Sequence, residues 1–182
     1  MKRLDEFVSR FGLLLDAGAD EPRILREGAA LLADLVRHDD WLPADFARAK
    51  AGSYCQYLLH LDPRERFCVV SFVWGPGVRT PIHDHTVWGM VGVMRGAEIC
   101  HEYDWPVADA PMAEKARHRL EPGNIDKVSP RIGDVHVVEN ALADQASISI
   151  HVYGANIGTL TRHVFDPSTG AVKPFISGYS NA

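Results

Sequence analysis

Apolar side chains recur every three or four positions through the first 50 residues, which is the period of an amphipathic helix. The first stripe of this kind consists of Leu4, Phe7, Val8, Phe11, Leu14 and Leu15. A second helix is expected after Asp20, which can cap it, with Pro22 in the first turn. Its stripe consists of Leu25, Ala29, Leu32 and Val36, and residues 42–46 predict a short third helix. Such stripes indicate faces that pack on a core.

From Ser53 onward the pattern changes to short runs rich in Val, Ile, Tyr and Phe, separated by Gly, Pro, Asn and Asp. The clearest runs are 67–74, 89–94, 135–138 and 147–153, and the turn-forming segments include 75–77, 122–124 and 130–134. Many short strands with turn signals between them are typical of an all-β sandwich or barrel. The sequence therefore predicts a mainly β protein, with a helical segment at 1–50 packed on a β domain at 51–182.

Composition and charge narrow the class of protein. With 182 residues the chain fits one domain, and a net charge of −5 without a cluster of Lys and Arg disfavours nucleic acid as a partner. No apolar run reaches the roughly 20 residues that span a bilayer, and residues 1–6 turn acidic where a signal peptide turns apolar. Cys55, Cys68 and Cys100 are an odd set without CxxC spacing, which favours reduced thiols. We expect a cytoplasmic protein that binds neither nucleic acid nor membrane.

Two histidines, His83 and His85, flank a single residue at the entrance of a predicted strand. In a strand, residues two positions apart lie on one face, about 6.6 Å apart, so both imidazoles can reach one metal ion. On a helix the same spacing would point them apart. The pair alone fits two surface histidines equally well, so its meaning depends on the residues around it.

Glycines, a proline and a third histidine surround this pair at regular spacing. The frame consists of Gly77, His83, His85, Gly89 and Gly96, followed by Gly123, Pro130, Gly133, His136 and Asn140. It resembles the paired motifs of the cupin superfamily, Gly-x5-His-x-His and Pro-x-Gly-x2-His-x3-Asn, with the second motif one residue longer here. The resemblance implies a double-stranded β-helix, a jelly-roll-like barrel, in which His83, His85 and His136 bind a metal ion.

A carboxylate common in such sites is missing. Most metal-binding cupins carry a Glu four or five residues after the second histidine, where this chain has Gly89 and Met90. The resemblance therefore implies a site of three neutral imidazoles. Such a site leaves a ferrous ion with its full charge and with open positions, which suits a substrate thiolate beside O2. The ordinary non-haem oxygenase triad has a carboxylate instead.

Three-histidine cupins with a glycine at that position resemble the thiol dioxygenases, the family of cysteine dioxygenase and the bacterial 3-mercaptopropionate dioxygenases. The matching segments are 54–58, 82–86, 133–136 and 147–153. In this family a Ser-x-His-x-Tyr strand forms a hydrogen-bonded relay beside the iron, which makes Ser149, His151 and Tyr153 the expected catalytic residues. Their alternation with apolar residues predicts one polar and one apolar strand face, although alternation by itself also fits a polar face in solvent.

Two exchanges resemble the bacterial members of the family. Mammalian cysteine dioxygenases have a carboxylate-binding Arg where this chain has Gln56, and a Cys cross-linked to the Tyr where it has Gly89. In enzymes resembling 3-mercaptopropionate dioxygenase, an Arg in the strand after the relay holds the substrate carboxylate. Arg162, nine residues after Tyr153, stands in that position, although an Arg taken alone is expected on the surface. We expect Arg162, together with Gln56, to bind the substrate.

The resemblance implies a thiol dioxygenase with Fe(II) as its cofactor and with a small thiol carboxylate and O2 as its substrates. The product would be a sulfinate, most simply that of 3-mercaptopropionate, and no organic cofactor is needed. Cysteine is the first alternative substrate. A cupin isomerase, or a dioxygenase of a non-thiol substrate with another metal, is disfavoured by the relay strand. A non-catalytic ligand sensor often carries a DNA-binding domain, whereas this sequence shows no helix-turn-helix or basic extension.

Overall fold

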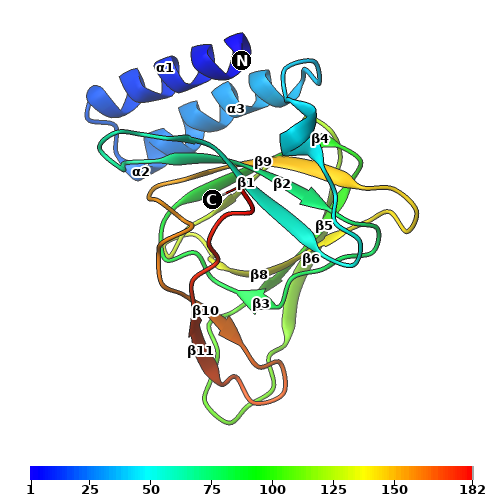
Figure 1. Ribbon diagram of the computed structural model, residues 1–182. Helices are drawn as coiled ribbons and strands as arrows, with labels where there is room; N and C mark the ends of the chain where they lie inside the picture. Colours follow the sequence, from blue (N-terminus) through cyan, green and yellow to red (C-terminus); the bar gives the residue numbers. More distant parts are fainter. Residues whose placement is uncertain (182) are drawn as a thin grey trace.

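Two antiparallel β-sheets face each other in the computed structural model, which describes residues 1–181 (Figure 1). Their strand orders are β1-β2-β9-β4-β7 and β11-β10-β3-β8-β5-β6. The first sheet contains β1 (Tyr54–Leu61), β2 (Cys68–Trp74), β4 (Gly89–Arg95), β7 (Ile125–Val128) and β9 (Ser147–Tyr153). The second contains β3 (Ile82–His83), β5 (Glu98–Tyr103), β6 (Glu114–Leu120), β8 (Val135–Asn140), β10 (Arg162–Phe165) and β11 (Val172–Phe175). This arrangement of two facing antiparallel sheets is a double-stranded β-helix, and it confirms the predicted mainly β fold.

The helices precede the strands, as predicted. They are α1 (Lys2–Asp16), α2 (Glu21–Arg23), the π-helical turn η1 (Ile24–Gly28), α3 (Ala29–Val36) and the 3-10 turn η2 (Ala44–Ala47). The Asp20 side chain caps α2 by accepting a hydrogen bond of 3.0 Å from the backbone N–H of Arg23. Within residues 1–181, no helix combines the length and the apolar character needed to cross a bilayer. The division of the chain at residue 50 stays a prediction.

The helical layer decides which face of β9 points into the barrel. Ile148, Ile150 and Val152 pack in one cluster with the apolar stripes of α1 and α3, and Figure 1 shows these helices, in blue, together on one side of the barrel. The packing is close at Gly28, where a Cβ atom would lie 2.6 Å from a ring carbon of Phe11. Because the apolar face of β9 is covered by helices, its polar face points between the two sheets.

The strands predicted from the four clearest apolar runs are present as β2, β4, β8 and β9. The strand predicted at His83 and His85 is present only as the short β3, which ends at His83, so His85 lies just outside it. The sequence pattern did not reveal the polar strands β6 and β7. In β6 only Leu120 is buried, because this strand lies at the edge of its sheet and pairs with β5 alone. A strand that buries almost nothing carries no alternation of apolar and polar residues, so its sequence is indistinguishable from a loop.

Candidate metal centre and its cavity

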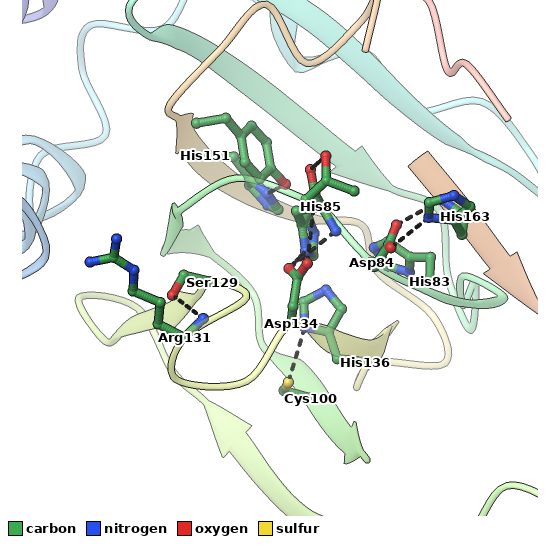
Figure 2. A network of polar contacts seen from close by, with 12 residues as sticks. His83, Asp84, His85, Cys100, Ser129, Arg131, Asp134, His136, His151 and His163 are labelled. Atoms are coloured by element: carbon green, nitrogen blue, oxygen red, sulfur yellow. Dashed lines mark hydrogen bonds and ion pairs between the residues drawn. The ribbon is translucent and has the colours of Figure 1, made fainter. Parts of the chain in front are cut away.

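Three histidines of the six-stranded sheet come together inside the barrel. His83 on β3 and His136 on β8 are paired in register, and His85 follows just after β3. Ring centroids are 5.0 Å apart for His83–His85, 4.7 Å for His83–His136 and 4.8 Å for His85–His136. One nitrogen of each lies within 4.8 Å of the others, and Figure 2 shows the three side chains close together. These three side chains can therefore serve as ligands of one metal ion.

Each of the three rings uses Nδ1 for a contact away from the common centre. The contacts are His83 Nδ1 to the Pro81 carbonyl at 3.1 Å, His85 Nδ1 to Asp134 Oδ1 at 2.9 Å, and His136 Nδ1 to Cys100 Sγ at 3.4 Å. Metal-binding histidines usually donate their second N–H to such an outer partner, which fixes the ring and its tautomer. The arrangement leaves Nε2 of each ring available to a metal ion.

Asp134 fixes the position of the second histidine. Its Oδ1 also accepts a hydrogen bond of 3.1 Å from the backbone N–H of His85, and its Oδ2 accepts one of 2.9 Å from that of Thr86. Thr86 has φ of 61°, in the left-handed region that β-branched residues rarely adopt, and the two backbone contacts hold it there. The sequence analysis did not single out Asp134. Its place two residues before His136, directly ahead of β8, was a usable signal.

Burial favours the neutral form of two of the three candidate ligands, His83 and His136. Burial, reinforced by the neighbouring His85, holds the pKa of His83 well below its usual value. Burial and then His83 lower the pKa of His136 in the same way. Neutral imidazoles are the form that binds metal, and they suit first-row ions such as iron, zinc and copper. The donor set therefore fits a divalent transition metal.

The predicted relay is assembled along β9, beside these histidines. Ser149 Oγ lies 2.8 Å from His151 Nε2, and His151 Nδ1 lies 2.8 Å from the Tyr153 hydroxyl. The indole N–H of Trp74, which the sequence analysis missed, donates to Ser149 Oγ at 3.0 Å. The Tyr153 ring stacks on that of His85 with centroids 5.4 Å apart. Burial raises the pKa of the Tyr153 phenol, so this group stays protonated.

A cavity of about 160 Å³ adjoins the relay and the histidine cluster. Its wall includes His83, His136, Tyr153, Arg162 and Gln56. The structure therefore brings two of the three candidate ligands, the end of the relay and both predicted substrate-binding residues to one small space.

Arg162 is buried, with 5% of its surface exposed, rather than on the surface. Its guanidinium lies 4.5 Å above the ring of Phe175 and donates a hydrogen bond of 2.8 Å to Ser177 Oγ. Its Nε–H has no partner among the described residues. A buried guanidinium with an unused donor in a cavity wall is suited to binding an anion.

The segment 177–181 runs back along β1 and carries the partners of Gln56 (Figure 1). The Gln56 side-chain amide donates to Ser177 Oγ at 3.2 Å and to the Gly178 carbonyl at 3.0 Å. The backbone of Gln56 bonds twice to Ser180, once through the Ser180 hydroxyl and once through its N–H. Gln56 and Arg162 are thus joined through Ser177.

A larger cavity, of about 520 Å³, adjoins His136 and is lined by Cys100, Asp126 and Asp134 among others. Its described lining includes neither Tyr153 nor Arg162. Cys100, Asp126 and His118 form a second group of donor atoms within 4.8 Å of one another. Both ring nitrogens of His118 already face carboxylates, Asp126 at 3.1 Å and Glu102 at 3.3 Å. These contacts account for the second group, and the smaller cavity is the candidate site because Tyr153, Arg162 and two of the clustered histidines line it.

Comparison with known proteins places the chain in a family. A family model described as cysteine dioxygenase type I matches residues 35–166. The chain belongs to this family. Cysteine dioxygenase type 1 of Rattus norvegicus and that of Mus musculus are each 29% identical to it over 132 residues, which is 70% of this chain and 64% of theirs. The chain thus spans 64% of these cysteine dioxygenases, and its closeness to the 3-mercaptopropionate enzymes stays a prediction.

Solved cupin structures also resemble the chain. A cupin superfamily protein of Desulfitobacterium hafniense aligns with a TM-score of 0.48 and 11% identity, over 65% of this chain and 94% of that one. A cupin-like protein of Thermotoga maritima aligns with a TM-score of 0.46 and 21% identity, over 59% of this chain and 75% of that one.

Gly89 is the residue that the sequence resemblance led us to expect in place of a cross-linking cysteine. It is paired in register with Tyr153, and a Cβ atom on it would lie 2.7 Å from Cδ1 and 2.8 Å from Cε1 of that tyrosine. The ring therefore rests directly on the glycine, and Cys55, Cys68 and Cys100 are all free and buried.

We predict that the protein carries no thioether between a cysteine and Tyr153, because residue 89 provides no sulfur. Intact-mass spectrometry should give the mass of the sequence, without the loss of two hydrogens that a cross-link causes. Samples taken before and after incubation with iron and O2 should have the same mass. A cross-linked Tyr153 peptide in a digest would contradict this prediction.

Proposed function

We propose that this chain is a non-haem iron(II) thiol dioxygenase, which adds both atoms of O2 to the sulfur of a small thiol carboxylate and releases the sulfinate. The observation that carries the proposal is a buried cluster of three histidines, two of which line one small cavity together with Tyr153 and a buried Arg162. Membership of the cysteine dioxygenase family supports it. The reaction, RSH + O2 → RSO2H, balances without an external reductant because sulfur supplies the electrons.

The proposed ligands are the Nε2 atoms of His83, His85 and His136. Iron(II) held there would supply open positions at which a thiolate and O2 can bind side by side. The residues around it set the rest of the site. Asp134 and Cys100 orient two of the rings through Nδ1, and a ligand set without a carboxylate favours an anionic sulfur as the incoming group.

Arg162 is proposed to bind the substrate carboxylate. It lines the same cavity as His83 and His136, so a short molecule can reach both with its two ends. The aromatic rings of Phe72 and Phe175 also line this cavity and exclude water, which strengthens a charge-assisted hydrogen bond. The Tyr153 hydroxyl, held by His151, is proposed to position the substrate or O2 between them.

The preferred substrate is proposed to be 3-mercaptopropionate, with L-cysteine as the second candidate. Cysteine carries an ammonium group that 3-mercaptopropionate lacks. Among the described residues, the wall of the cavity contains no Asp or Glu to pair with an ammonium, whereas Arg162 serves the carboxylate that both thiols share. The similarity to cysteine dioxygenases of rat and mouse favours the second candidate, so the two must be compared directly.

We predict that the ferrous protein consumes O2 faster with 3-mercaptopropionate than with L-cysteine. We expect a higher kcat/KM for 3-mercaptopropionate, because the unpaired ammonium of cysteine weakens its binding in a partly dry cavity. The measurement is O2 uptake over a range of concentrations of each thiol, with the sulfinate quantified by mass spectrometry. A higher kcat/KM for cysteine would show that the substrate assignment is wrong, while the absence of uptake with either thiol would contradict the proposed activity itself.

A further inference from the structure

Glu98 is an acid in the interior of the barrel. It is the first residue of β5, its exposed fraction is 0%, and neither of its carboxyl oxygens has a hydrogen-bond partner within residues 1–181. A buried polar group without partners lowers the stability of a fold. The residue therefore calls for an explanation other than stability.

The Glu98 carboxyl faces the far end of the relay. Ser147 and Ser149 of β9 and Trp74 of β2 surround it. Trp74 and Ser149 are the two relay members furthest from Tyr153. The hydroxyl of Ser147 is also without a partner, so this end of the relay holds unused hydrogen-bonding capacity.

The other neighbours of the carboxyl bring little charge. Leu120 on β6 and Asn140 on β8 are paired in register with Glu98 and carry none. The titratable group whose pKa is raised by burial and also by the charge of Glu98 is the thiol of Cys100, two residues along the same strand. Among the described residues, no Lys or Arg contributes to the ionisation of Glu98, so no ion pair keeps the carboxyl ionised.

The hydrogen-bonding capacity of Ser149 leaves one position for Glu98. A hydroxyl donates one hydrogen and accepts through two lone pairs, whereas the indole N–H of Trp74 only donates and occupies one lone pair. His151 Nε2 takes either the hydrogen or the second lone pair. Whichever it takes, Ser149 keeps one position free, and the Glu98 carboxyl faces this hydroxyl.

We propose that Glu98 is the terminal residue of the relay and that its protonation sets the direction of the hydrogen bonds in it. A neutral Glu98 donates to Ser149, which donates to His151 Nε2. His151 then carries its hydrogen on Nδ1 and donates to the Tyr153 oxygen, so the Tyr153 hydrogen is free to point into the cavity. An ionised Glu98 accepts from Ser149, which reverses the Ser149–His151 and His151–Tyr153 bonds and turns the Tyr153 hydrogen toward His151.

The proton released by Glu98 is accounted for along the same path. Glu98 passes its proton to Ser149, Ser149 passes its own hydrogen to His151 Nε2, and His151 passes its Nδ1 hydrogen to the Tyr153 oxygen. Tyr153 then releases its original hydrogen into the cavity. Ser149, His151 and Tyr153 stay neutral overall, and the burial that lowers the pKa of His151 keeps this ring from becoming cationic. Glu98 is thus a positioning residue that also stores one proton for the site.

The direction of the pH dependence follows from burial, which raises the pKa of Glu98 to about 8. Below this pH the acid is neutral and Tyr153 donates into the cavity. Above it, the acid is ionised and that donor is lost. Activity should therefore fall as the pH rises, about tenfold from about pH 7 to about pH 9, in step with the neutral fraction of Glu98.

The first test is spectroscopic and uses the full chain with zinc in place of iron. Infrared difference spectra should show the carbonyl band of a neutral carboxylic acid that disappears as the pH rises through about 8. The band should be absent in Glu98→Gln and present in Glu114→Gln, a matched change at an exposed acid on β6. Nitrogen NMR should show the hydrogen of His151 moving from Nδ1 to Nε2 over the same range. A His151 tautomer that does not change in the unsubstituted protein would overturn the proposal.

The second test is the pH profile of O2 uptake by the iron-loaded protein. The amide of Glu98→Gln can donate to Ser149 at every pH, so this variant should lose the alkaline decline. Its rate of O2 uptake should change less than about twofold from about pH 7 to about pH 9. An alkaline decline equal to that of the unsubstituted protein would refute the proposed switch. The inference rests on the proposed function only for the role of Tyr153, because the spectroscopic test needs neither iron nor a thiol.

Discussion

Replacement of His136 by alanine is expected to remove both the metal and the oxygen uptake of the protein. The remaining pair, His83 and His85, are the only other members of this cluster among the described residues and would offer two imidazoles. Loss of an outer partner alone typically costs 10- to 100-fold in metal affinity or activity, so loss of a direct ligand should cost more than about 100-fold. Iron should fall from about one ion per chain to a small fraction of that.

The measurement for this variant is elemental analysis after dialysis, with O2 uptake on the same sample. His60→Ala is a suitable control, because His60 is a half-buried histidine on β1 that packs on Phe67 outside the cluster. Thermal unfolding of both variants separates metal loss from loss of the fold. Full iron occupancy in folded His136→Ala would remove His136 from the ligand set.

Replacement of Arg162 by alanine should reduce kcat/KM for the thiol carboxylate by roughly 10- to 100-fold, since a hydrogen bond to a charged group contributes about 1.5–3 kcal/mol. Arg162→Lys should recover only part of the loss, because an ammonium keeps the charge but not two parallel hydrogen bonds. The decisive comparison is between the thiol carboxylate and a simple aminothiol without a carboxylate. Its turnover should hardly respond to Arg162→Ala, because the group that Arg162 binds is missing.

The measurement for Arg162 is O2 uptake with both kinds of thiol, by each variant and by Arg119→Ala as a control. Arg119 is an exposed arginine that pairs with Glu121 and lies on β6, the edge strand of the sheet that does not contain the relay. An equal loss with carboxylated and uncarboxylated thiols would mean that Arg162 supports the fold through Ser177 and Phe175 and does not bind the substrate.

The sequence predicted those parts of the site whose residues lie two positions apart along the chain. His83 and His85 lie two residues apart next to a short strand, and Ser149, His151 and Tyr153 follow the same period on β9. A period of two fixes which residues share a face. It does not say which face is buried, and this was settled only by the helices that cover Ile148, Ile150 and Val152.

The parts that the sequence did not predict depend on contacts between distant segments. Cys100 reaches His136 across 36 positions, and Trp74 reaches Ser149 across 75. Glu98 and Glu102 lie on the same strand and have the same side chain, yet only Glu98 is fully buried. Closure of the barrel creates that difference, and no local pattern of residues distinguishes the two.

The return of residues 177–181 along β1 has a practical consequence for producing the protein. These residues hold Gln56 and Leu58 through side-chain and backbone hydrogen bonds, and Ser177 also holds Arg162. An affinity tag fused at the C-terminal side would emerge next to these hydrogen bonds and could disrupt them. A tag fused ahead of α1 would instead extend from the helical layer. Purification by an N-terminal tag is therefore the safer choice for kinetic work.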